Sequence, residues 1–351
     1  MRSAPIVVAL LAWAAACSSG GTKAAPFAPA RPAPEIDVVY RTQRVGEVAY
    51  ERLAARRPFD VLHATYAGAP DQAAVPSGGT LTSVDQLFQL RPEGLQQLSG
   101  RQPSPGTGDQ YLAPMAGELT ARGVAKRLGT RTVAGRRCVV FRFAEPPVGP
   151  LKRLGPRDHD DICLTADDLV LAEDWTLKGT RVLSRIAVSV DLHPAALTER
   201  LTPRAALPAP TGAPTAVPTS EPAFLAEPPI PAGFALARRD GFVFRQPDPG
   251  TGAPVSLYQS TVWAYQREAD LITVEAGQSA EPGHVPWDAG DPTQPVDMAL
   301  GKAASVVRSD GMEIRLALDP SRWVRVRGTI PVADLVPFAR QLSLAPKGRN
   351  P

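Results

Sequence analysis

Apolar and polar residues alternate along much of the segment from residue 36 to residue 202. In 138–143, for example, Val139, Phe141 and Phe143 share one side of an extended chain. This alternation is typical of strands with one buried face. It predicts further strands over 36–40, 59–66, 162–165, 169–177 and 181–192. In the last of these, one side carries Val182, Ile186, Val188, Val190 and Leu192.

Two stretches in this first half depart from alternation and predict helices. Residues 84–90 form a short one. Residues 110–128 carry Leu112, Met115 and Leu119 at helical spacing, although Pro114 lies among them. We therefore expect a meandering antiparallel sheet with helices on one face.

The second half predicts a smaller α+β unit. Strands are expected over 241–244, 255–265, 271–275, 312–318 and 323–328. Pro331 then opens a helix at a favoured early position. Its apolar positions recur at helical spacing and are Leu335, Phe338, Ala339 and Leu342, and Pro337 inside the pattern predicts a kink or a late start.

Proline marks the boundaries between these units, because the 38 prolines among 351 residues are unevenly distributed. Residues 18–35 are rich in Ser, Gly, Ala and Pro, and residues 203–231 are a proline-rich stretch without periodicity. The predicted organisation is a signal peptide at 1–16, a flexible tether at 17–35, a first domain at 36–202, an extended linker at 203–231 and a second domain at 232–345.

The N-terminus predicts export and lipid attachment. Arg2 precedes an apolar run over 6–13 that is too short to span a bilayer and ends in small residues, as in a signal peptide. Cys17 follows Ala14, Ala15 and Ala16, which resembles the bacterial lipobox although Ala14 replaces the usual leucine. The expectation is a lipid-anchored protein of the cell envelope, and the alternative is a soluble secreted protein cut near Ala16.

The other cysteines, Cys138 and Cys163, both lie in predicted strands. In an oxidising compartment they are candidates for a disulfide between neighbouring strands. The alternative is two separately buried thiols.

Charge and motifs narrow the function classes. A net charge of +3 with 21% charged residues is too weak for a nucleic-acid-binding surface. Residues 158–161 form the only dense cluster of potential metal ligands, but neighbours on an extended chain point in alternate directions, so a solvated turn is expected. Residues 247–252 precede no helix, which indicates a loop between strands and not a phosphate loop. We expect no enzyme activity, no metal and no cofactor.

Two segments resemble a known group of proteins. Residues 132–143 read TVAGRRCVVFRF and residues 162–173 read ICLTADDLVLAE. These hairpins are similar to the central hairpins of the lipoprotein-carrier (LolA/LolB-like) and MucB/RseB-like envelope proteins. In those families such hairpins build an incomplete β-barrel wrapped around helices. Residues 231–234, 258–274 and 325–331 resemble the smaller C-terminal domain of the MucB/RseB type.

The resemblance implies a fold and a role. The expected fold is α+β, with an antiparallel half-barrel sheet, helices on its concave face and a smaller α+β domain. The expected function is binding of a hydrophobic ligand, a lipid or a lipoprotein acyl chain, on a concave sheet. The alternative is a regulatory partner or sensor of a membrane signalling protein such as an anti-sigma factor. Candidate ligand contacts are Phe141, Phe143, Trp175 and Val188; the alternative for Phe141, Phe143 and Trp175, and the more usual role of such residues, is ordinary core.

Overall fold

Most of the chain outside its termini folds into two antiparallel sheets. The computed structural model describes residues 31–70, 74–83, 86–98, 111–144, 158–202, 215–219, 224–248, 250–288, 290–291, 293–308 and 310–346. The first sheet has 11 strands, in the spatial order β6-β5-β4-β3-β2-β1-β11-β10-β9-β8-β7. These strands are β1 (Glu35–Arg44), β2 (Glu47–Arg56), β3 (Asp60–Tyr66), β4 (Gly78–Ser83), β5 (Gln86–Arg91), β6 (Gly94–Gln97), β7 (Ala125–Val133), β8 (Arg136–Phe143), β9 (His159–Leu164), β10 (Val170–Leu177) and β11 (Thr180–Asp191).

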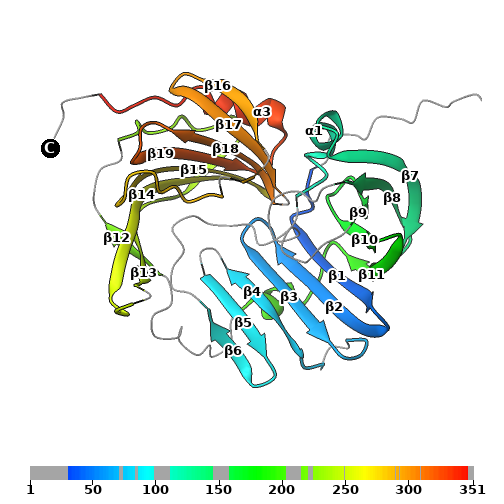
Figure 1. Ribbon diagram of the computed structural model, residues 1–351. Coiled ribbons are helices and arrows are strands. Elements are labelled where there is room, and N and C mark those ends of the chain that lie inside the picture. Colours follow the sequence, from blue (N-terminus) through cyan, green and yellow to red (C-terminus); the bar gives the residue numbers. More distant parts are fainter. Residues whose placement is uncertain are drawn as a thin grey trace, which may run out of the picture.

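The second sheet has 8 strands, in the order β12-β13-β14-β15-β19-β18-β17-β16. They are β12 (Thr215–Thr219), β13 (Ala235–Pro247), β14 (Pro254–Arg267), β15 (Asp270–Ser279), β16 (Gln294–Met298), β17 (Gly301–Arg308), β18 (Gly311–Ala317) and β19 (Arg322–Gly328). Figure 1 shows that both sheets curve strongly and that neither closes into a barrel. The predicted α+β fold on an open antiparallel half-barrel sheet is confirmed.

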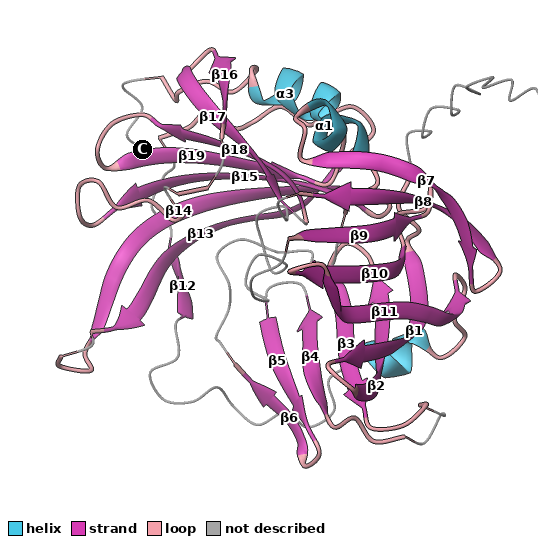
Figure 2. Cartoon of the chain, turned by 45° about the vertical axis from the view of Figure 1, so that its right-hand side comes forward, coloured by secondary structure: helices cyan, strands magenta, loops and turns pink. Residues whose placement is uncertain are grey.

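Helices are short and few among the described residues: α1 (Ala116–Ala121), α2 (Leu197–Leu201) and α3 (Val332–Ala339). Figures 1 and 2 show α1 and α3 close together where the two sheets meet. Leu119 of α1, Phe141 of β8 and Leu335 of α3 belong to one continuous apolar core. Arg122, just after α1, also donates a hydrogen bond of 3.1 Å to the Ser305 hydroxyl on β17. The junction of the sheets is therefore packed and not an open hinge.

Several predicted elements are confirmed. The strands on either side of the turn at 166–168 are β9 and β10, and residues 248 and 250–252 lie in the connection between β13 and β14. There the Asp248 carboxylate accepts hydrogen bonds from the backbone of Gly250 and Thr251. The helix after Pro331 is α3, with Pro337 inside it and with Leu335, Phe338 and Ala339 buried.

Other predictions are wrong. The helix predicted over 84–90 is instead strand β5 from Gln86, and residues 84–85 lie outside the described part. An isolated seven-residue helix is marginal, whereas Phe88 and Leu90 are both buried when the segment is extended between β4 and β6. The helix predicted over 110–128 is limited to α1, because residues from Ala125 onward pair with β8.

The sequence pattern predicts burial of the face of β11 that carries Ile186 and Val188, but these two residues are not buried. Leu183, Ser184 and Ala187 are buried, whereas Ile186 and Val188 are exposed. A register shift opposite Val39 and Tyr40 moves the strand off strict alternation. This shift leaves apolar side chains of β11 facing outward.

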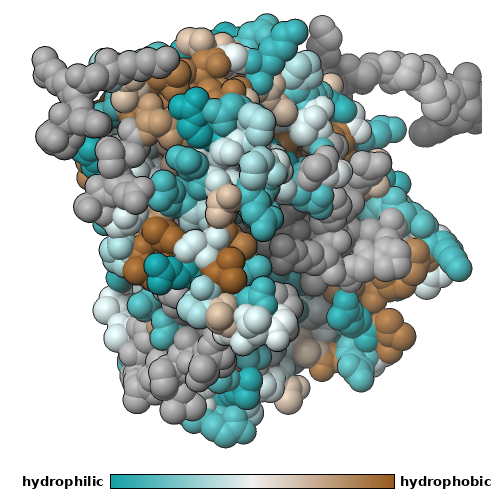
Figure 3. Space-filling view, turned by 60° about the vertical axis from the view of Figure 1, so that its left-hand side comes forward, coloured by the Kyte–Doolittle hydropathy of each residue, from teal (hydrophilic) through white to brown (hydrophobic). Residues whose placement is uncertain are grey.

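The proline-rich segment 203–231 is not entirely a connector. Its residues Thr215–Thr219 form β12, the edge strand beside β13. Ala216 of β12 is buried in a small cluster with Phe242 and Val262. Elsewhere on the surface, the face drawn in Figure 3 shows apolar side chains as small patches separated by polar ones.

Candidate functional site

A cavity of about 650 Å³ lies between α2 and strands β3 to β6 of the first sheet. Its lining residues come from the sheet, from the turn between β5 and β6, from the β3–β4 connection and from α2; they are Leu62, Tyr66, Ala74, Val75, Pro76, Leu81, Leu90, Arg91, Pro92, Glu93, Gly94, Leu95, Ala196, Glu199, Arg200 and Thr202. Its volume is within the range of about 300–1,000 Å³ that is usual for small-molecule sites.

The floor of this cavity is apolar because of strand register. Leu62 of β3 is opposite Leu81 of β4, and Leu90 of β5 is opposite Leu95 of β6. Residues directly opposite each other in an antiparallel pair project from the same face, so these leucines form two neighbouring rows. Leu62, Leu81 and Leu90 are buried, whereas Val75 at the mouth is 70% exposed. An apolar chain placed in the cavity would cover this floor and the mouth.

The wall of the cavity is α2, which two kinds of contact hold on the sheet. Leu197 and Leu201 are buried in one apolar cluster with residues of β2, β3, β4 and β5. On the polar side, the Arg56 guanidinium donates a hydrogen bond of 2.8 Å to the Thr198 hydroxyl. A helix of five residues has no stability of its own, so these contacts fix its position.

An ion-pair cluster completes the attachment of α2. The Asp37 carboxylate on β1 lies 3.1 Å from Arg52 Nε and 3.2 Å from Arg200 Nε. Burial raises the pKa of Asp37 above its ordinary value, even though Arg52 and Arg200 both favour its charged form. Asp37 thus joins the middle of the sheet to the wall of the cavity.

The rim of the cavity is charged. Arg91 and Glu93 are exposed at the β5–β6 turn, and Glu199 and Arg200 come from α2. Arg91 donates a hydrogen bond of 3.2 Å to the Gln89 side chain. An apolar floor with a charged rim suits an amphiphile, whose chain enters and whose polar end stays in water.

The structure places the four predicted ligand contacts elsewhere. Phe141 and Phe143 are 2% and 1% exposed, in the core that contains α1. The Trp175 indole is also buried and donates a hydrogen bond of 2.7 Å to Glu173. Val188 is 51% exposed on β11. None of the four lines the cavity beside α2.

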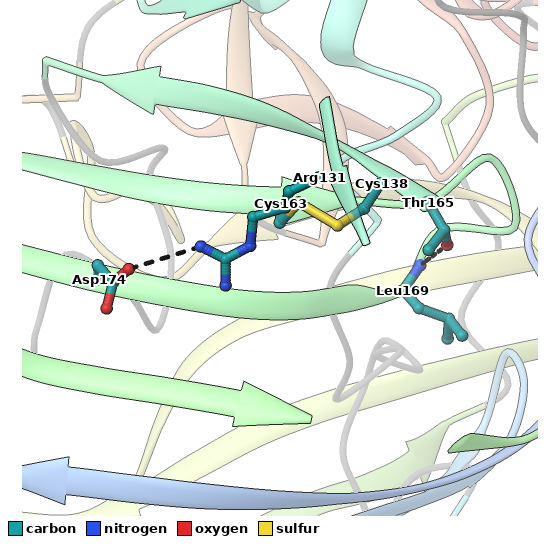
Figure 4. The surroundings of a disulfide bond; sticks show 6 residues. All are labelled: Arg131, Cys138, Cys163, Thr165, Leu169 and Asp174. Carbon is teal, nitrogen blue, oxygen red and sulfur yellow. Dashed lines mark hydrogen bonds and ion pairs between the residues drawn. A yellow bond between two sulfur atoms is a disulfide. The ribbon is translucent and has the colours of Figure 1, made fainter. Parts of the chain in front are cut away.

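Cys138 and Cys163 form a disulfide between β8 and β9, with Cα atoms 5.4 Å apart. Figure 4 shows the bridge next to the hairpin in which Thr165 accepts a hydrogen bond from the Leu169 backbone. Arg131 and Asp174 lie nearby and form an ion pair of 3.9 Å. Both cysteines are buried, so the bridge is shielded from reductants in the folded protein.

Residues 158–161 do not form the predicted solvated turn, because His159 begins β9 and Asp160 is buried. The Asp161 carboxylate binds Arg142 through two hydrogen bonds of 2.7 Å, whereas Asp158 accepts one from the Gly179 backbone. The carboxylates diverge along the strand. Within the described ranges, no group of three His, Cys, Asp or Glu residues is placed to hold a metal.

A second cavity, of about 560 Å³, lies beside α3 and the second sheet. Its walls include Phe234, Ile272, Phe338 and the exposed Ile230. The Arg267 guanidinium covers the Phe234 ring at 4.5 Å and pairs with Asp270. This cavity is smaller than the one beside α2, and the Arg267 and Asp270 side chains that flank it already pair with each other.

Sequence reasoning missed the cavity beside α2 because it assigned 84–90 to a helix. A usable signal was present: Pro92, Glu93 and Gly94 separate two short runs that contain leucine, and Phe88 and Leu90 lie at alternate positions in the first run. Proline followed by a polar residue and glycine is typical of a tight turn between strands. The signal peptide, Cys17 and residues 17–30 of the tether lie outside the described residues. No helix in the described part of the chain is long and apolar enough to cross a membrane.

Comparisons with known proteins give structural neighbours only. No family model and no curated protein sequence matches the chain. A crystal structure of MucB is 15% identical over 91% of this chain and 95% of its own, with a TM-score of 0.31. In the Pseudomonas aeruginosa MucA/MucB complex the identity is 16%, the coverage 89% and 94%, and the TM-score 0.32. A Vibrio parahaemolyticus outer membrane lipoprotein-sorting domain is 9% identical over 47% of this chain and 89% of its own, with a TM-score of 0.23.

Proposed function

We propose that this protein binds a hydrophobic ligand, an acyl chain of a lipid or lipoprotein, in the cavity between α2 and strands β3 to β6. The observation that carries the proposal is the double row of the buried Leu62, Leu81 and Leu90 and the partly buried Leu95 beneath a cavity of about 650 Å³. Each methylene moved from water into such a site contributes about 0.8 kcal/mol. The charged rim would keep the polar end of the ligand in solvent.

The proposed location is the cell envelope, with the chain held at a membrane by lipid on Cys17. The signal-like N-terminus supports export, and the disulfide between Cys138 and Cys163 fits an oxidising compartment. The proposed domain division, at 36–202 and 232–345, is supported by the two sheets, except that β12 of the second sheet lies in the proposed linker. The proposed role is binding and not catalysis, and the apolar floor of the cavity supports this role.

The test uses the full chain with Cys17→Ser, which carries no lipid of its own. Native mass spectrometry is expected to show copurifying lipid, and delipidated protein is expected to bind N-phenylnaphthylamine with increased fluorescence. Val75→Glu places a charge at the mouth without disturbing a buried contact, and should weaken dye binding about tenfold.

Val188→Glu is the matched control, since Val188 is also an exposed valine but lies on β11 away from the cavity. Its dye affinity should stay within about twofold of the parent protein. Equal affinity of the Val75 and Val188 variants would place the ligand outside this cavity. A loss confined to Val188→Glu would instead favour the contact predicted from sequence.

A second candidate function is regulation of a membrane signalling protein such as an anti-sigma factor. The observation in its favour is the separate cavity beside α3, whose exposed Ile230 and half-buried Phe234 offer an apolar contact. Pull-down from membranes with the parent protein and with Ile230→Glu tests it. A protein partner retained equally by both would place the contact elsewhere.

A further inference from the structure

One end of the first sheet exposes apolar residues that no packing in the described structure explains. Val45 occupies the turn between β1 and β2 and is 85% exposed. Its φ angle of 42° lies in the left-handed region, which is disfavoured for a β-branched residue. At the corresponding position of the β7–β8 and β10–β11 turns the chain has Ala134 and Lys178. An exposed valine in a strained turn contributes nothing visible to the fold, and this points to a role outside it.

Further apolar residues adjoin this turn on one face of the sheet. Val48 of β2 is 42% exposed, and Ile186 of β11 is 38% exposed. Register places Val48 opposite Gln43 on one side of β1 and Ile186 opposite Arg41 on the other side. Because Arg41 and Gln43 are two residues apart, Val48 and Ile186 project from the same face of the sheet. Val188 is exposed two residues further along β11, and we name the four exposed residues together the β1 patch: Val45, Val48, Ile186 and Val188.

Positive charge surrounds the β1 patch. Arg41 and Arg44 are exposed on β1, and Lys178 is exposed at the β10–β11 turn; Arg181 is exposed as well but forms an ion pair of 3.7 Å with Asp174. Because β11 runs antiparallel to β1, the β10–β11 turn lies at the same end of the sheet as Val45. Arg41 makes no ion pair with any described residue, and Glu47 is the exposed acid beside the turn. Apolar side chains ringed by cations fit a surface that is apolar inside and anionic at its boundary.

We propose that this end of the first sheet docks on a membrane surface that contains anionic phospholipids. Val45 enters the boundary between headgroups and acyl chains, while Arg41, Arg44 and Lys178 contact the phosphates. Each cation near an anionic membrane surface contributes about 1 kcal/mol. This interaction is separate from lipid attached at Cys17.

The length of the chain before β1 is compatible with both attachments. Val45 and residue 35 lie at opposite ends of β1, whose 10 residues span about 34 Å. The segment from Cys17 to residue 31 reaches up to about 48 Å when extended. Lipid on Cys17 can therefore insert in the same membrane on which the far end of β1 rests.

Docking would also bring the mouth of the proposed ligand cavity to the bilayer. The strands alternate in direction from β1 to β6, so the β3–β4 connection with Val75 and the β5–β6 turn lie at the same end as Val45. A hydrophobic ligand could then pass between bilayer and cavity with little exposure to water. This consequence rests on the proposed function, whereas the docking itself does not.

The experiment measures binding of the full chain with Cys17→Ser to lipid vesicles by co-sedimentation. Vesicles of phosphatidylcholine and phosphatidylglycerol in equal parts should bind the protein. Vesicles of phosphatidylcholine alone should bind it at least about tenfold more weakly. Val45→Glu should weaken binding to the mixed vesicles about tenfold. Lys178→Glu should weaken binding to the mixed vesicles by a similar factor. Added salt should reduce the difference in vesicle binding between Lys178→Glu and the parent protein.

Val255→Glu is the matched control, since Val255 is an exposed valine on β14 of the second sheet and is 42% exposed. A second readout tests insertion directly. Tryptophan is placed by Val45→Trp or, as control, by Val255→Trp, and the vesicles carry brominated acyl chains. Additional quenching is expected for the first protein and not for the second. Equal quenching in both, or equal vesicle binding by Val45→Glu and Val255→Glu, would overturn the proposal.

Dye binding without vesicles separates this inference from the proposed function. Val45→Glu should bind N-phenylnaphthylamine as the parent protein does, because Val45 does not line the cavity. Vesicle binding that persists when dye binding is absent would support docking and contradict the ligand cavity. Dye binding with no vesicle binding would support the ligand cavity and contradict docking.

Discussion

Arg200 on α2 and Asp37 on β1 form an ion pair in which Nε and Oδ2 are 3.2 Å apart. This pair is the polar link between the cavity wall and the centre of the first sheet. Asp37 is also held by Arg52 from β2, so the carboxylate stays partnered on one side if Arg200 is removed. The position of α2, and with it the width of the cavity, depends on this contact and on the burial of Leu197 and Leu201.

Arg200→Ala should loosen α2 without unfolding the sheet. We expect the free energy of unfolding to fall by about 1–2 kcal/mol, because a partly buried carboxylate loses one of its two cations. Backbone amides of α2 should exchange with deuterium faster than in the parent protein. Arg41→Ala removes an exposed arginine from β1 and should change stability by less than about 0.5 kcal/mol. Unchanged exchange in Arg200→Ala would show that the leucines alone hold α2.

The disulfide should contribute to stability by restricting the unfolded chain. Cys138 and Cys163 are separated by 25 residues, and removal of a bridge over a loop of this order costs about 2–4 kcal/mol. The double variant Cys138→Ala and Cys163→Ala should lose this amount in urea denaturation. Parent protein reduced while unfolded should show the same loss, which separates the bridge from the side-chain change. A loss below about 1 kcal/mol would contradict the assignment.

Leu119→Ala should weaken the junction of the two sheets. Leu119 of α1 is 0% exposed and shares a core with residues of both sheets. Truncating a buried leucine to alanine costs about 2–5 kcal/mol. Leu128→Ala, at an exposed leucine of β7, is the control and should cost less than about 1 kcal/mol. Calorimetry that shows one sheet unfolding first in the Leu119 variant, and one joint transition in the parent, would confirm the coupling.

Acid should destabilise the second sheet through Glu313. Burial disfavours its charged form, but Arg325, Arg327, Arg308 and Arg315 outweigh burial and lower the pKa below its ordinary value of 4.5. A carboxyl group whose pKa is lower in the folded state contributes stability that is present above the unfolded pKa and is lost as the pH falls through the folded pKa. Denaturation at several pH values should therefore show a fall in the free energy of unfolding below pH 4.5.

Glu313→Gln tests the assignment of that fall. Arg315 Nε lies 2.5 Å from the Glu313 carboxylate, and loss of a buried charge partner costs about 3–5 kcal/mol. The variant should be less stable than the parent at pH 7 and should differ from it less in acid. A constant difference between the two proteins across the pH range would assign the acid sensitivity to other carboxylates.

The sequence by itself determined the strand-rich class and much of the strand set, because alternation in segments such as 138–143 depends only on having one buried face. It also indicated the β9–β10 hairpin, the disulfide pair and the helix after Pro331, since turn residues and helical spacing act within a few positions. Residues 86–90 escaped this reasoning. Their leucines and phenylalanine fit a short helix or a strand equally well locally, and pairing with β4 and β6 selected the strand.

Only the tertiary structure decided which apolar residues are available to a ligand or a membrane. Phe141 and Phe143 had the pattern of a ligand wall, but they are buried in a core that also contains residues of α1 and of the second sheet. Leu62 and Leu81 belong to different strands, and register alone brings them into one row beneath α2. The exposure of Val45 likewise follows from its place at the tip of a hairpin. Burial of a side chain depends on elements distant in sequence, and local patterns carry no information about where those elements pack.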